Sequence, residues 1–502
     1  MQGERGIIEK RIDDGTIRVA LVYPGSYREA MASLGYMIIH SILNEQEDIV
    51  AHRFTLDSPF SIEAGLGLKN YGIILASVHF DLQLPLLMRY VAAQKISLRR
   101  EEREIPIILG GPGVWNPLPS SVFADGVFIG EGEDHIVEAV RSMADSRKDA
   151  VVPGLFNSWL KNQVEFQRHP LGYRPPATVV EQSAYGRKAV YVESSRGCNF
   201  GCRFCMIGWT QRPRRDRKLS QILDWIAEGL ENGGEKVFFY ASDVLGHPHM
   251  KKVLETLAEL RIPFSLASMR LDRLDDEMLE ILGKNGTKTI TVALETASER
   301  LKPVINKMIP NDAVVELAAR AKRFGMRRVK IYQIIGLPGE TKEDLLALKD
   351  VVSKIKALKM SVEISANALI PKPYTPFQWA AFPGIDYVKS VNKMLKRELH
   401  ADTMNPKRAF IQALLSMGDE RVGEVLLRAY RDLNYSHWLE AISSVGINPQ
   451  KYLKEERETP WMNYVHTGVR PEFLREEWER AKQGIPTPPC HKKCSLCGVC
   501  FP

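Results

Sequence analysis

Long hydrophobic runs and scattered cysteines are both scarce in this sequence. No uncharged apolar stretch in the 502 residues reaches the roughly 18 residues that a membrane-spanning helix needs. The opening residues, MQGERGIIEKRIDDG, also lack the apolar core of a secretion signal. We therefore expect a cytoplasmic protein without a membrane segment. Because no cysteine pairs are spread along the chain, a disulfide framework of the kind found in secreted domains is excluded.

Motifs of several enzyme classes are missing as well. No G-x-G-x-x-G follows the first predicted strand, which disfavours a bound dinucleotide. Neither a G-x-S-x-G motif, a Ser-His-Asp set nor a pair of catalytic carboxylates is evident, so cofactors are expected to carry the difficult chemistry. The formal net charge of +7 is spread over a long chain and does not indicate a nucleic-acid partner.

Cysteine is present in only two clusters, and the first lies in the segment SRGCNFGCRFC. Its three cysteines, Cys198, Cys202 and Cys205, have the spacing C-x3-C-x2-C on a glycine-containing loop that follows a predicted strand. Three thiolates at this spacing suit three corners of an iron-sulfur cube. A zinc site would need a fourth ligand, and only a distant histidine could supply it because none lies near the loop in sequence.

The second cluster, CHKKCSLCGVC, lies at the end of the chain. Its spacing is C-x3-C-x2-C-x2-C, formed by Cys490, Cys494, Cys497 and Cys500. Four thiolates this close together could surround one zinc ion or one iron ion, or could hold a second iron-sulfur cluster. The spacing alone does not choose between these metals.

The first part of the chain alternates predicted strands and helices. Apolar strands are expected at 18–24, 71–81 and 105–111, each followed by a turn and a segment with helical or irregular character, and another strand begins at 126. This alternation predicts an α/β fold with a parallel, doubly wound, Rossmann-like sheet that binds its ligand at the carboxyl ends of the strands. Residues 1–165 are expected to form this domain.

Three further regions follow. Residues 166–188 contain several prolines and little periodicity, which indicates a linker or strap. Six more predicted strands with intervening helices in residues 189–385 indicate a partial or full β/α barrel. Residues 386–502 are expected to be mainly helical and to end in the four-cysteine tail.

The three-cysteine loop resembles the motif of the radical S-adenosylmethionine (SAM) family. This resemblance implies a 4Fe-4S cluster whose fourth iron is chelated by SAM. YASD at 240–243 stands where the family often has a Gly-Gly-Glu motif, and ALETASERL and IIGLPGET resemble its fourth-strand and fifth-strand segments. The residues that the resemblance places near SAM are Phe204, Ser242, Asp243, Glu295, Gly336 and Pro338.

A finer resemblance, in CRFCMIGWTQRPRRDR, VKIYQIIGLPGETKEDL and IPKPYTPFQW, is to the radical SAM proteins that carry a cobalamin-binding domain. It implies that the N-terminal domain holds cobalamin at its strand exits. The D-x-H-x-x-G motif of histidine-ligated cobalamin domains is missing, so His79 could reach the cobalt or could make an ordinary hydrogen bond. The expected cobalamin contacts are Ser77, His79, Gly110, Gly111, Gly130, Glu131 and Gly132.

The resemblance implies a cobalamin-dependent radical SAM methyltransferase acting on an unactivated carbon. The pattern is most similar to members that methylate a glutamine side chain of methyl-coenzyme M reductase, so we expect a protein or peptide substrate and a low-potential electron donor. Tyr332 could face the substrate or pack in the barrel. Because members with a cysteine tail consume electrons, iron is favoured there over zinc. The alternatives are an RNA-modifying methylthiotransferase and a non-catalytic cobalamin and iron-sulfur sensor.

Overall fold

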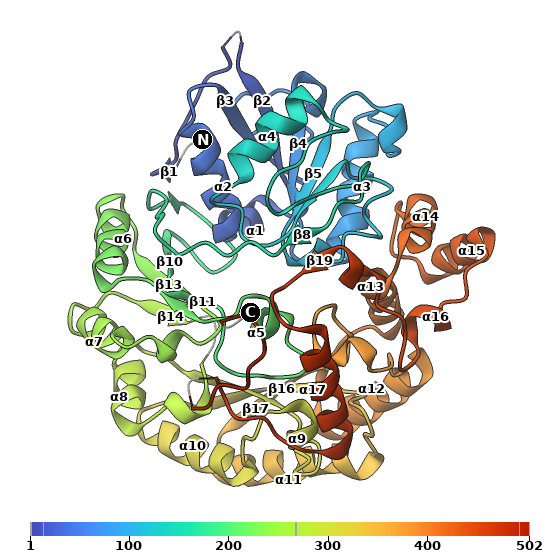
Figure 1. The fold of residues 1–502 in the computed structure, drawn as a ribbon. Helices are drawn as coiled ribbons and strands as arrows, with labels where there is room; N and C mark the ends of the chain where they lie inside the picture. The colour runs from blue at the N-terminus through green and yellow to red at the C-terminus, as the bar shows by residue number, and fades with distance from the viewer. Residues whose placement is uncertain (1–2, 14, 267–268, 491, 501–502) are drawn as a thin grey trace.

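The computed structural model describes residues 3–13, 15–266, 269–490 and 492–500 (Figure 1). Its N-terminal part is a six-stranded sheet with the order β3-β2-β4-β5-β6-β7, in which only the edge strand β7 is antiparallel. The strands are β2 (Ile17–Tyr23), β3 (Ile49–Thr55), β4 (Ile73–Ser77), β5 (Ile107–Gly110), β6 (Gly126–Phe128) and β7 (Leu155–Asn157).

Helices cover both faces of this sheet, as expected for a doubly wound fold. Side chains of β2 alternate between two hydrophobic clusters: Ala20 and Val22 pack with the α3 side, whereas Val19 and Leu21 pack with the α2 and α4 side. Burial on both faces explains why the strands read as continuous apolar runs in the sequence. The helices are α2 (Leu34–Asn44), α3 (Gln83–Ala93) and α4 (Ile136–Asp145).

The central part contains the six expected strands in two parallel sheets. One has the order β10-β13-β14 and the other β15-β16-β17-β18, where β18 (Asp402–Thr403) is a short strand that the sequence did not predict. No pairing joins β14 to β15 among the described residues, so the strands form a partial barrel and a closed one is not shown. The other strands are β10 (Ala189–Glu193), β13 (Lys236–Tyr240), β14 (Phe264–Leu266), β15 (Thr289–Glu295), β16 (Arg328–Ile335) and β17 (Ser361–Ala368).

Amphipathic helices surround these strands (Figure 1). On β16 the residues alternate, with Val329, Ile331 and Ile335 buried in the cluster that also contains residues of the outer helices. Lys330 and Tyr332 therefore lie on the opposite, inner face. The helices of this part are α6 (Leu219–Glu231), α7 (Met250–Glu259), α8 (Asp276–Lys284), α9 (Lys302–Ile305), α10 (Asn311–Arg323) and α11 (Lys342–Ala357).

The C-terminal part is mainly helical and touches both preceding parts. Short β19 (Val465–His466) pairs in parallel with β8 (Val164–Glu165), and Asn116 Nδ2 donates hydrogen bonds to the carbonyls of Ser416 at 3.1 Å and Gly418 at 2.8 Å. Figure 1 shows this part as the orange and red segments, most of them on the right-hand side of the view, beside the N-terminal sheet and the barrel strands. Its helices are α12 (Ile385–Leu399), α13 (Pro406–Met417), α14 (Glu420–Ala429), α15 (Tyr435–Val445), α16 (Gln450–Leu453) and α17 (Pro471–Gln483).

The strap, residues 166–188, is tied to the start of the chain. Its strand β9 (Val179–Val180) pairs antiparallel with β1 (Glu4–Arg5). The strap thus runs between the N-terminal sheet and the first barrel strand and holds them side by side. In the described part of the chain, no helix is both long enough and apolar enough to cross a membrane.

Candidate functional site

The three-cysteine loop, residues 195–205, follows the carboxyl end of β10. Its base is closed by β11 (Ser195–Arg196), which pairs antiparallel with β12 (Arg215–Asp216). Gly197 has a φ of +75°, and a Cβ there would overlap the carbonyl oxygen of Gln211. Only glycine therefore fits this position without moving the backbone. The loop ends at Cys205, where the short helix α5 (Met206–Thr210) begins.

A buried arginine fixes the middle of the loop. The Nε atom of Arg203 donates to Glu477 Oε2 at 3.0 Å, and its two terminal nitrogens donate to the carbonyls of Pro303 and Ile485, each at 2.7 Å. The indole Nε1 of Trp209 donates to the carbonyl of Cys202 at 2.9 Å. The cysteines are thus presented by a backbone that α9, α17 and α5 hold in place.

The three thiols lie within electrostatic reach of one another. Burial, followed by the neighbouring Cys202 thiol, raises the pKa of Cys205 to about 12. Burial also raises the pKa of Cys198 and of Cys202. Three electrostatically coupled thiols on one loop have the chemistry of an iron-sulfur ligand set, whose protons cluster binding would draw off, but their arrangement in the described residues is not that of a formed metal site.

Charged groups of both signs surround the thiols. Glu295, at the end of β15, has a φ of +65°, which is rare for a residue other than glycine, and its carboxylate pairs with Lys307 Nζ at 3.0 Å. The charges of Lys307 and Arg270 lower the pKa of Cys202 while that of Glu295 raises it. Neither Lys307 nor Arg270 was predicted, because the fold alone brings α9 and the segment after β14 to the loop.

The predicted residues Ser242 and Asp243 lie beyond the end of β13. Asp243 is buried, and its Oδ1 atom has no hydrogen-bond partner among the described residues. Burial raises the pKa of Asp243, while nearby Arg214 lowers it. Ser242 is exposed. Anionic Asp243 and Glu295 with cationic Lys307 and Arg270 form a mixed-charge set that fits a ligand bearing one amino group and one carboxylate.

Phe204 and the turn at 336–338 meet in one apolar cluster. Phe204 packs against a cluster that includes Trp209 and Leu337, with Ile334 of β16 beside it. Gly336 has a φ of +79°, and a Cβ there would overlap the ring of Pro383. Gly336 and Pro338 thus flank Leu337 of this cluster, and they line a second cavity together with Tyr387 and Trp478.

Glu340 holds the turn after β16. Its Oε1 atom accepts hydrogen bonds from Gly336 N at 2.6 Å and from the Tyr387 hydroxyl at 2.7 Å. Burial raises the pKa of Glu340 to about 7. This carboxyl is therefore partly protonated near neutral pH while it fixes the backbone of the turn.

A cavity of about 610 Å³ lies between the N-terminal sheet and the three-cysteine loop. One wall is formed by the carboxyl ends of β2, β4, β5 and β6, and includes the junction between β2 and β4 where the strand order changes direction. The other wall includes Arg196 and Gln211 of the loop region, together with Glu193 and Tyr240 at the ends of β10 and β13. One cavity therefore joins the two parts of the molecule.

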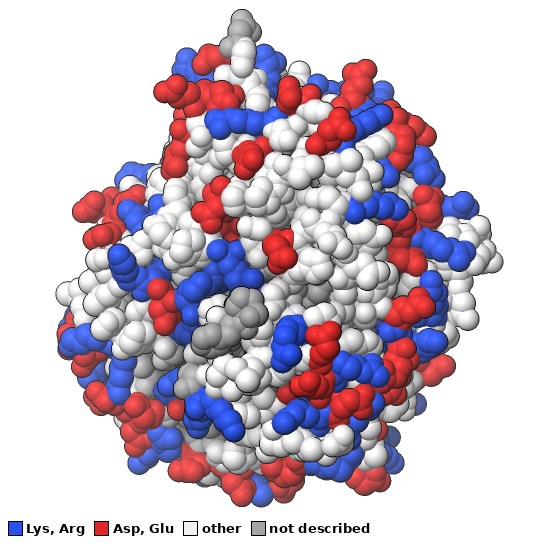
Figure 2. Space-filling view, viewed as in Figure 1, with Lys and Arg blue, Asp and Glu red and all other residues white. Residues whose placement is uncertain are grey.

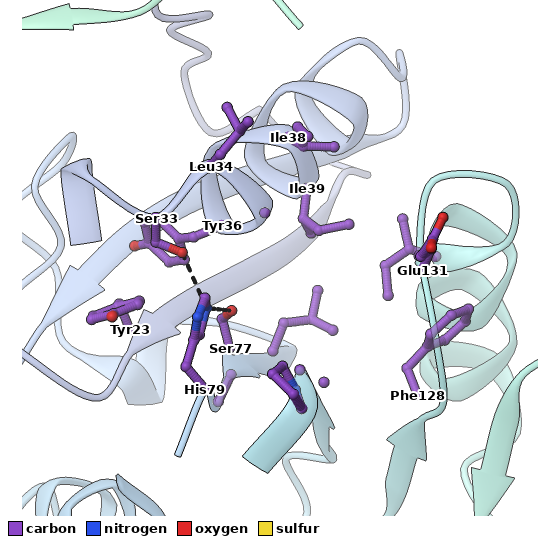
Figure 3. Close-up of a pocket in the computed structure, with 18 of the residues that line it drawn as sticks. Tyr23, Ser33, Leu34, Tyr36, Ile38, Ile39, Ser77, His79, Phe128 and Glu131 are labelled. Atoms are coloured by element: carbon purple, nitrogen blue, oxygen red, sulfur yellow. Dashed lines mark hydrogen bonds between the residues drawn. The ribbon is translucent and has the colours of Figure 1, made fainter. Parts of the chain in front are cut away.

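All seven predicted cobalamin contacts line this cavity. His79 Nε2 lies 3.1 Å from the hydroxyls of both Ser33 and Ser77 (Figure 3). Burial lowers the pKa of His79 to about 4, so the imidazole is neutral at physiological pH. The hydroxyls thereby orient the ring and engage one of its two nitrogens. Trp115 also lines the cavity, and its buried Nε1 is unpartnered in the described structure.

The glycines at the strand exits are explained in two ways. A Cβ at Gly111 would overlap the carbonyl of Val78, and one at Gly130 would overlap the backbone of Gln167. These two glycines are therefore required by the packing of the protein's own backbone. Gly110 has room for a Cβ, whereas one at Gly132 would press on Ile39.

Glu131 joins the two walls of the cavity. Its carboxylate pairs with Arg215 at 2.7 Å and with Arg196 at 3.1 Å, and it accepts a hydrogen bond from His169 N at 2.9 Å. Arg196 also pairs with Glu133 and Glu193, each at 2.6 Å. This buried network ties the three-cysteine loop to the N-terminal domain. Apart from the local pair of Arg196 with Glu193, its partners lie far apart in the sequence, so no local motif could have revealed the link between the two domains.

Tyr332 lies on the inner face of the barrel strands. Its side chain is 37% exposed, and it is paired across the sheet with Ala293 on β15 and Ser365 on β17. Lys330 Nζ lies 5.7 Å from the centre of its ring. A strand tyrosine used only for packing would be buried, so this position fits a residue that faces a bound molecule.

The four-cysteine tail, residues 490–500, lies against the outer side of the three-cysteine loop. Cys490 N donates to the carbonyl of Asn199 at 2.8 Å, and Asn306 Nδ2 bridges the carbonyls of Gly201 and Thr487 at 3.0 and 3.1 Å. Cys494 and Cys500 are exposed. Within the described ranges, no three His, Cys, Asp or Glu side chains are arranged to hold one metal ion, so neither zinc nor a single iron in the tail is shown.

An arc of parallel strands with a three-cysteine loop at its first carboxyl end defines a class of cluster-binding barrel enzymes. The chain matches the radical SAM superfamily over residues 192–352 and the N-terminal region of radical SAM proteins over residues 35–154. Residues 192–352 therefore form a radical SAM region.

The curated relatives include an uncharacterized protein matched over most of its length and named enzymes matched over a shorter part. An uncharacterized protein of Methanocaldococcus jannaschii is 29% identical over 426 residues, which are 81% of this chain and 90% of that protein. A cytidylyl-2-hydroxyethylphosphonate methyltransferase of Streptomyces wedmorensis is 27% identical over 39% of this chain and 37% of its own. A tRNA-2-methylthio-N(6)-dimethylallyladenosine synthase of Thermotoga petrophila is 26% identical over 34% of this chain and 41% of its own. The match to these two named enzymes spans less than half of their length.

The fold is similar to that of a solved structure. This is the radical S-adenosylmethionine methyltransferase TsrM of Kitasatospora setae with cobalamin and a [4Fe-4S] cluster bound, at a TM-score of 0.53 and 14% identity. The similarity covers 93% of this chain and 99% of that one, so it extends over the whole fold.

Proposed function

We propose that the protein is a cobalamin-dependent radical SAM methyltransferase that methylates an unactivated sp3 carbon. The observation that carries this proposal is the single cavity with the sheet edge on one side and Arg196 and Gln211 of the loop region on the other. A cofactor held at the sheet edge and one held at the loop would face each other across it. When bound, the cluster with SAM supplies a carbon-centred radical and cobalamin supplies a transferable methyl group.

Around the loop, each group has a positioning task. Cys198, Cys202 and Cys205 would hold the cluster. Asp243 and Glu295 would accept hydrogen bonds from the amino group of SAM, while Lys307 and Arg270 would pair with its carboxylate. Phe204 and the turn at 336–338 offer the apolar contact that an adenine ring needs.

In the cavity, the strand-exit residues would hold cobalamin. Ser77, His79, Gly110 and the residues 130–132 line it at the carboxyl ends of β4, β5 and β6. Because two hydroxyls already engage His79 Nε2, we favour water or no ligand on the lower face of the cobalt. Tyr332 on the inner barrel face would position the substrate.

The substrate we propose is a protein or peptide, with a glutamine side chain of methyl-coenzyme M reductase as the specific candidate. The inner barrel face supports a polar, uncharged group: its charges are paired, with Lys330 Nζ 2.7 Å from Glu363, and the hydroxyl-bearing Ser365 adjoins Tyr332. The tail would hold a further metal, iron in preference to zinc.

The test is turnover of the reconstituted protein with methyl-labelled SAM, cobalamin, dithionite and peptides of methyl-coenzyme M reductase. We expect release of 5′-deoxyadenosine and one label on a glutamine carbon, read by mass spectrometry. Label on RNA as a methylthio group would instead support a methylthiotransferase. A full cluster without any 5′-deoxyadenosine release would support a sensor and overturn the proposal.

A further inference from the structure

We propose that the tail is the docking face for a small acidic one-electron carrier protein with an iron-sulfur or flavin centre. The inference rests on the proposed function, because that function consumes electrons that the chain itself does not supply. The docking face consists of Arg470, Lys492, Lys493 and Leu496, with the exposed Cys494 and Cys500 between them.

The charged residues of the tail sequence have one sign. No Asp or Glu occurs after Glu479, whereas Arg480, Lys482, Lys492 and Lys493 do. Arg470 is joined to the tail, since its backbone N and its Nη2 donate to the carbonyls of Cys497 at 2.9 Å and Leu496 at 2.8 Å. Figure 2 shows a group of Lys and Arg side chains just above and to the left of the centre of the view, with acidic side chains also nearby. A partner that fits is acidic.

Leu496 supplies an apolar side chain to the docking face. Leu496 is 64% exposed, at a position with a φ of +54° that turns the tail back on itself. An isolated exposed leucine among cations is suited to a small, short-lived interface, the kind that electron-transfer encounters use. Charge would steer the partner toward this face, and Leu496 would supply an apolar contact in the bound complex.

The tail that carries this face contacts the three-cysteine loop directly. A single hydrogen bond, from Cys490 N to the carbonyl of Asn199 at 2.8 Å, joins the tail to the residue beside Cys198. The opposite side of the loop faces the cavity, where Arg196 is paired with carboxylates of the N-terminal domain. The tail side is thus the outward approach to the loop. One electron leaves the reduced centre of the carrier and enters the cluster, so the carrier is oxidised as the cluster is reduced.

The test measures binding of an acidic ferredoxin, and separately of a flavodoxin, to the holoprotein at low and high salt. We expect the pair Lys492→Glu and Lys493→Glu to weaken binding about tenfold at low salt and to flatten its salt dependence. The matched control is Lys389→Glu with Lys393→Glu, two exposed lysines on α12. Because the control changes the charge equally, its binding should stay within about twofold if position matters.

A second measurement compares reduction by the carrier with reduction by titanium(III) citrate. The tail variant should slow the first and leave the second unchanged. If titanium(III) citrate reduces no cluster in the wild type, the proposed function fails while the binding result still stands. Equal losses in the tail and control variants, or unchanged binding in both, would overturn the docking face. Equal iron content and unfolding temperature verify that the variants are folded.

Discussion

Single residues at this site are constrained by their own backbone as much as by a ligand. Gly197 holds the start of the three-cysteine loop at a φ of +75° against Gln211, and Glu295 adopts a φ of +65° beside Lys307. Strained positions of this kind persist only where the surrounding structure enforces them, and they gather at functional sites. Two predictions concern individual residues.

Gly197→Ala should disrupt the loop. The added Cβ would overlap the carbonyl of Gln211, and an L-residue is strained at this φ, so we expect a loss of about 1–3 kcal/mol in unfolding free energy. Iron bound per chain after reconstitution should fall by more than half. The control is Gly172→Ala, where a Cβ meets nothing within 4 Å. Equal iron content in the two variants would contradict the assignment.

His79→Gln should bind cobalamin with an unchanged absorption spectrum. Since Ser33 and Ser77 engage Nε2, the imidazole is not expected to ligate the cobalt, and glutamine retains hydrogen-bonding groups near those hydroxyls. Titration followed by absorbance should give an affinity within about tenfold of the wild type, because one hydrogen bond is worth about 0.5–1.5 kcal/mol. A spectral shift on mutation would show that His79 is a ligand.

Among the elements, α17 and the turn after β16 support the loop from outside. Glu477 on α17 meets Arg203 with both side chains almost fully buried, and Glu340 ties Gly336 to Tyr387 of α12. The pairs Arg203–Glu477 and Glu340–Tyr387 join residues far apart in the sequence. Each depends on helices of the C-terminal part packing on the barrel turns.

Arg203→Met should destabilise the fold strongly. It would leave Glu477 buried without its cation, and breaking a buried ion pair costs about 3–5 kcal/mol. Denaturant unfolding should show this loss, and Arg203→Met with Glu477→Leu should recover part of it. For comparison, Arg320→Met breaks the exposed pair with Asp276 and should cost less than about 1 kcal/mol. A loss as small for Arg203→Met would contradict its supporting role.

Glu340 should make stability depend on pH. Its pKa is about 7 in the folded protein and near 4.5 when unfolded, so the folded state binds more protons between these values. The unfolding free energy contributed by this group therefore falls as pH rises from about 4.5 to 7. Glu340→Gln keeps an acceptor for Gly336 and removes this dependence. Parallel curves of unfolding temperature against pH for the two proteins would refute the assignment.

At the scale of the whole molecule, buried charges hold the two halves of the cavity together. Glu131 and Glu133 of the N-terminal domain meet Arg196 and Arg215 of the barrel region, while Lys372 pairs with Asp81 on the other side of the junction. The strap, residues 166–188, crosses the same junction. The relative placement of the two domains thus depends on a few polar contacts.

Glu131→Gln should loosen this junction. The change leaves Arg196 and Arg215 with one fewer anion in a buried site, which costs more than the loss of a surface pair. We expect limited proteolysis within the strap to be about threefold or more faster, because local opening follows the lost free energy. Glu101→Gln, which alters an exposed pair with Arg100, should leave cleavage unchanged. Protection of both variants to the same degree would argue against the network.

The sequence by itself determined the elements and the cysteine loop, since apolar runs, glycine turns and thiol spacing are local properties. Cys198, Cys202 and Cys205 needed no knowledge of the fold, and the doubly wound sheet followed from strands buried on both faces. Only the tertiary structure decided that Arg196 meets Glu131, that Lys307 and Arg270 flank the thiols, and that the tail covers the loop. These contacts join segments far apart in the chain, and a charge or a turn has no local pattern that names its distant partner.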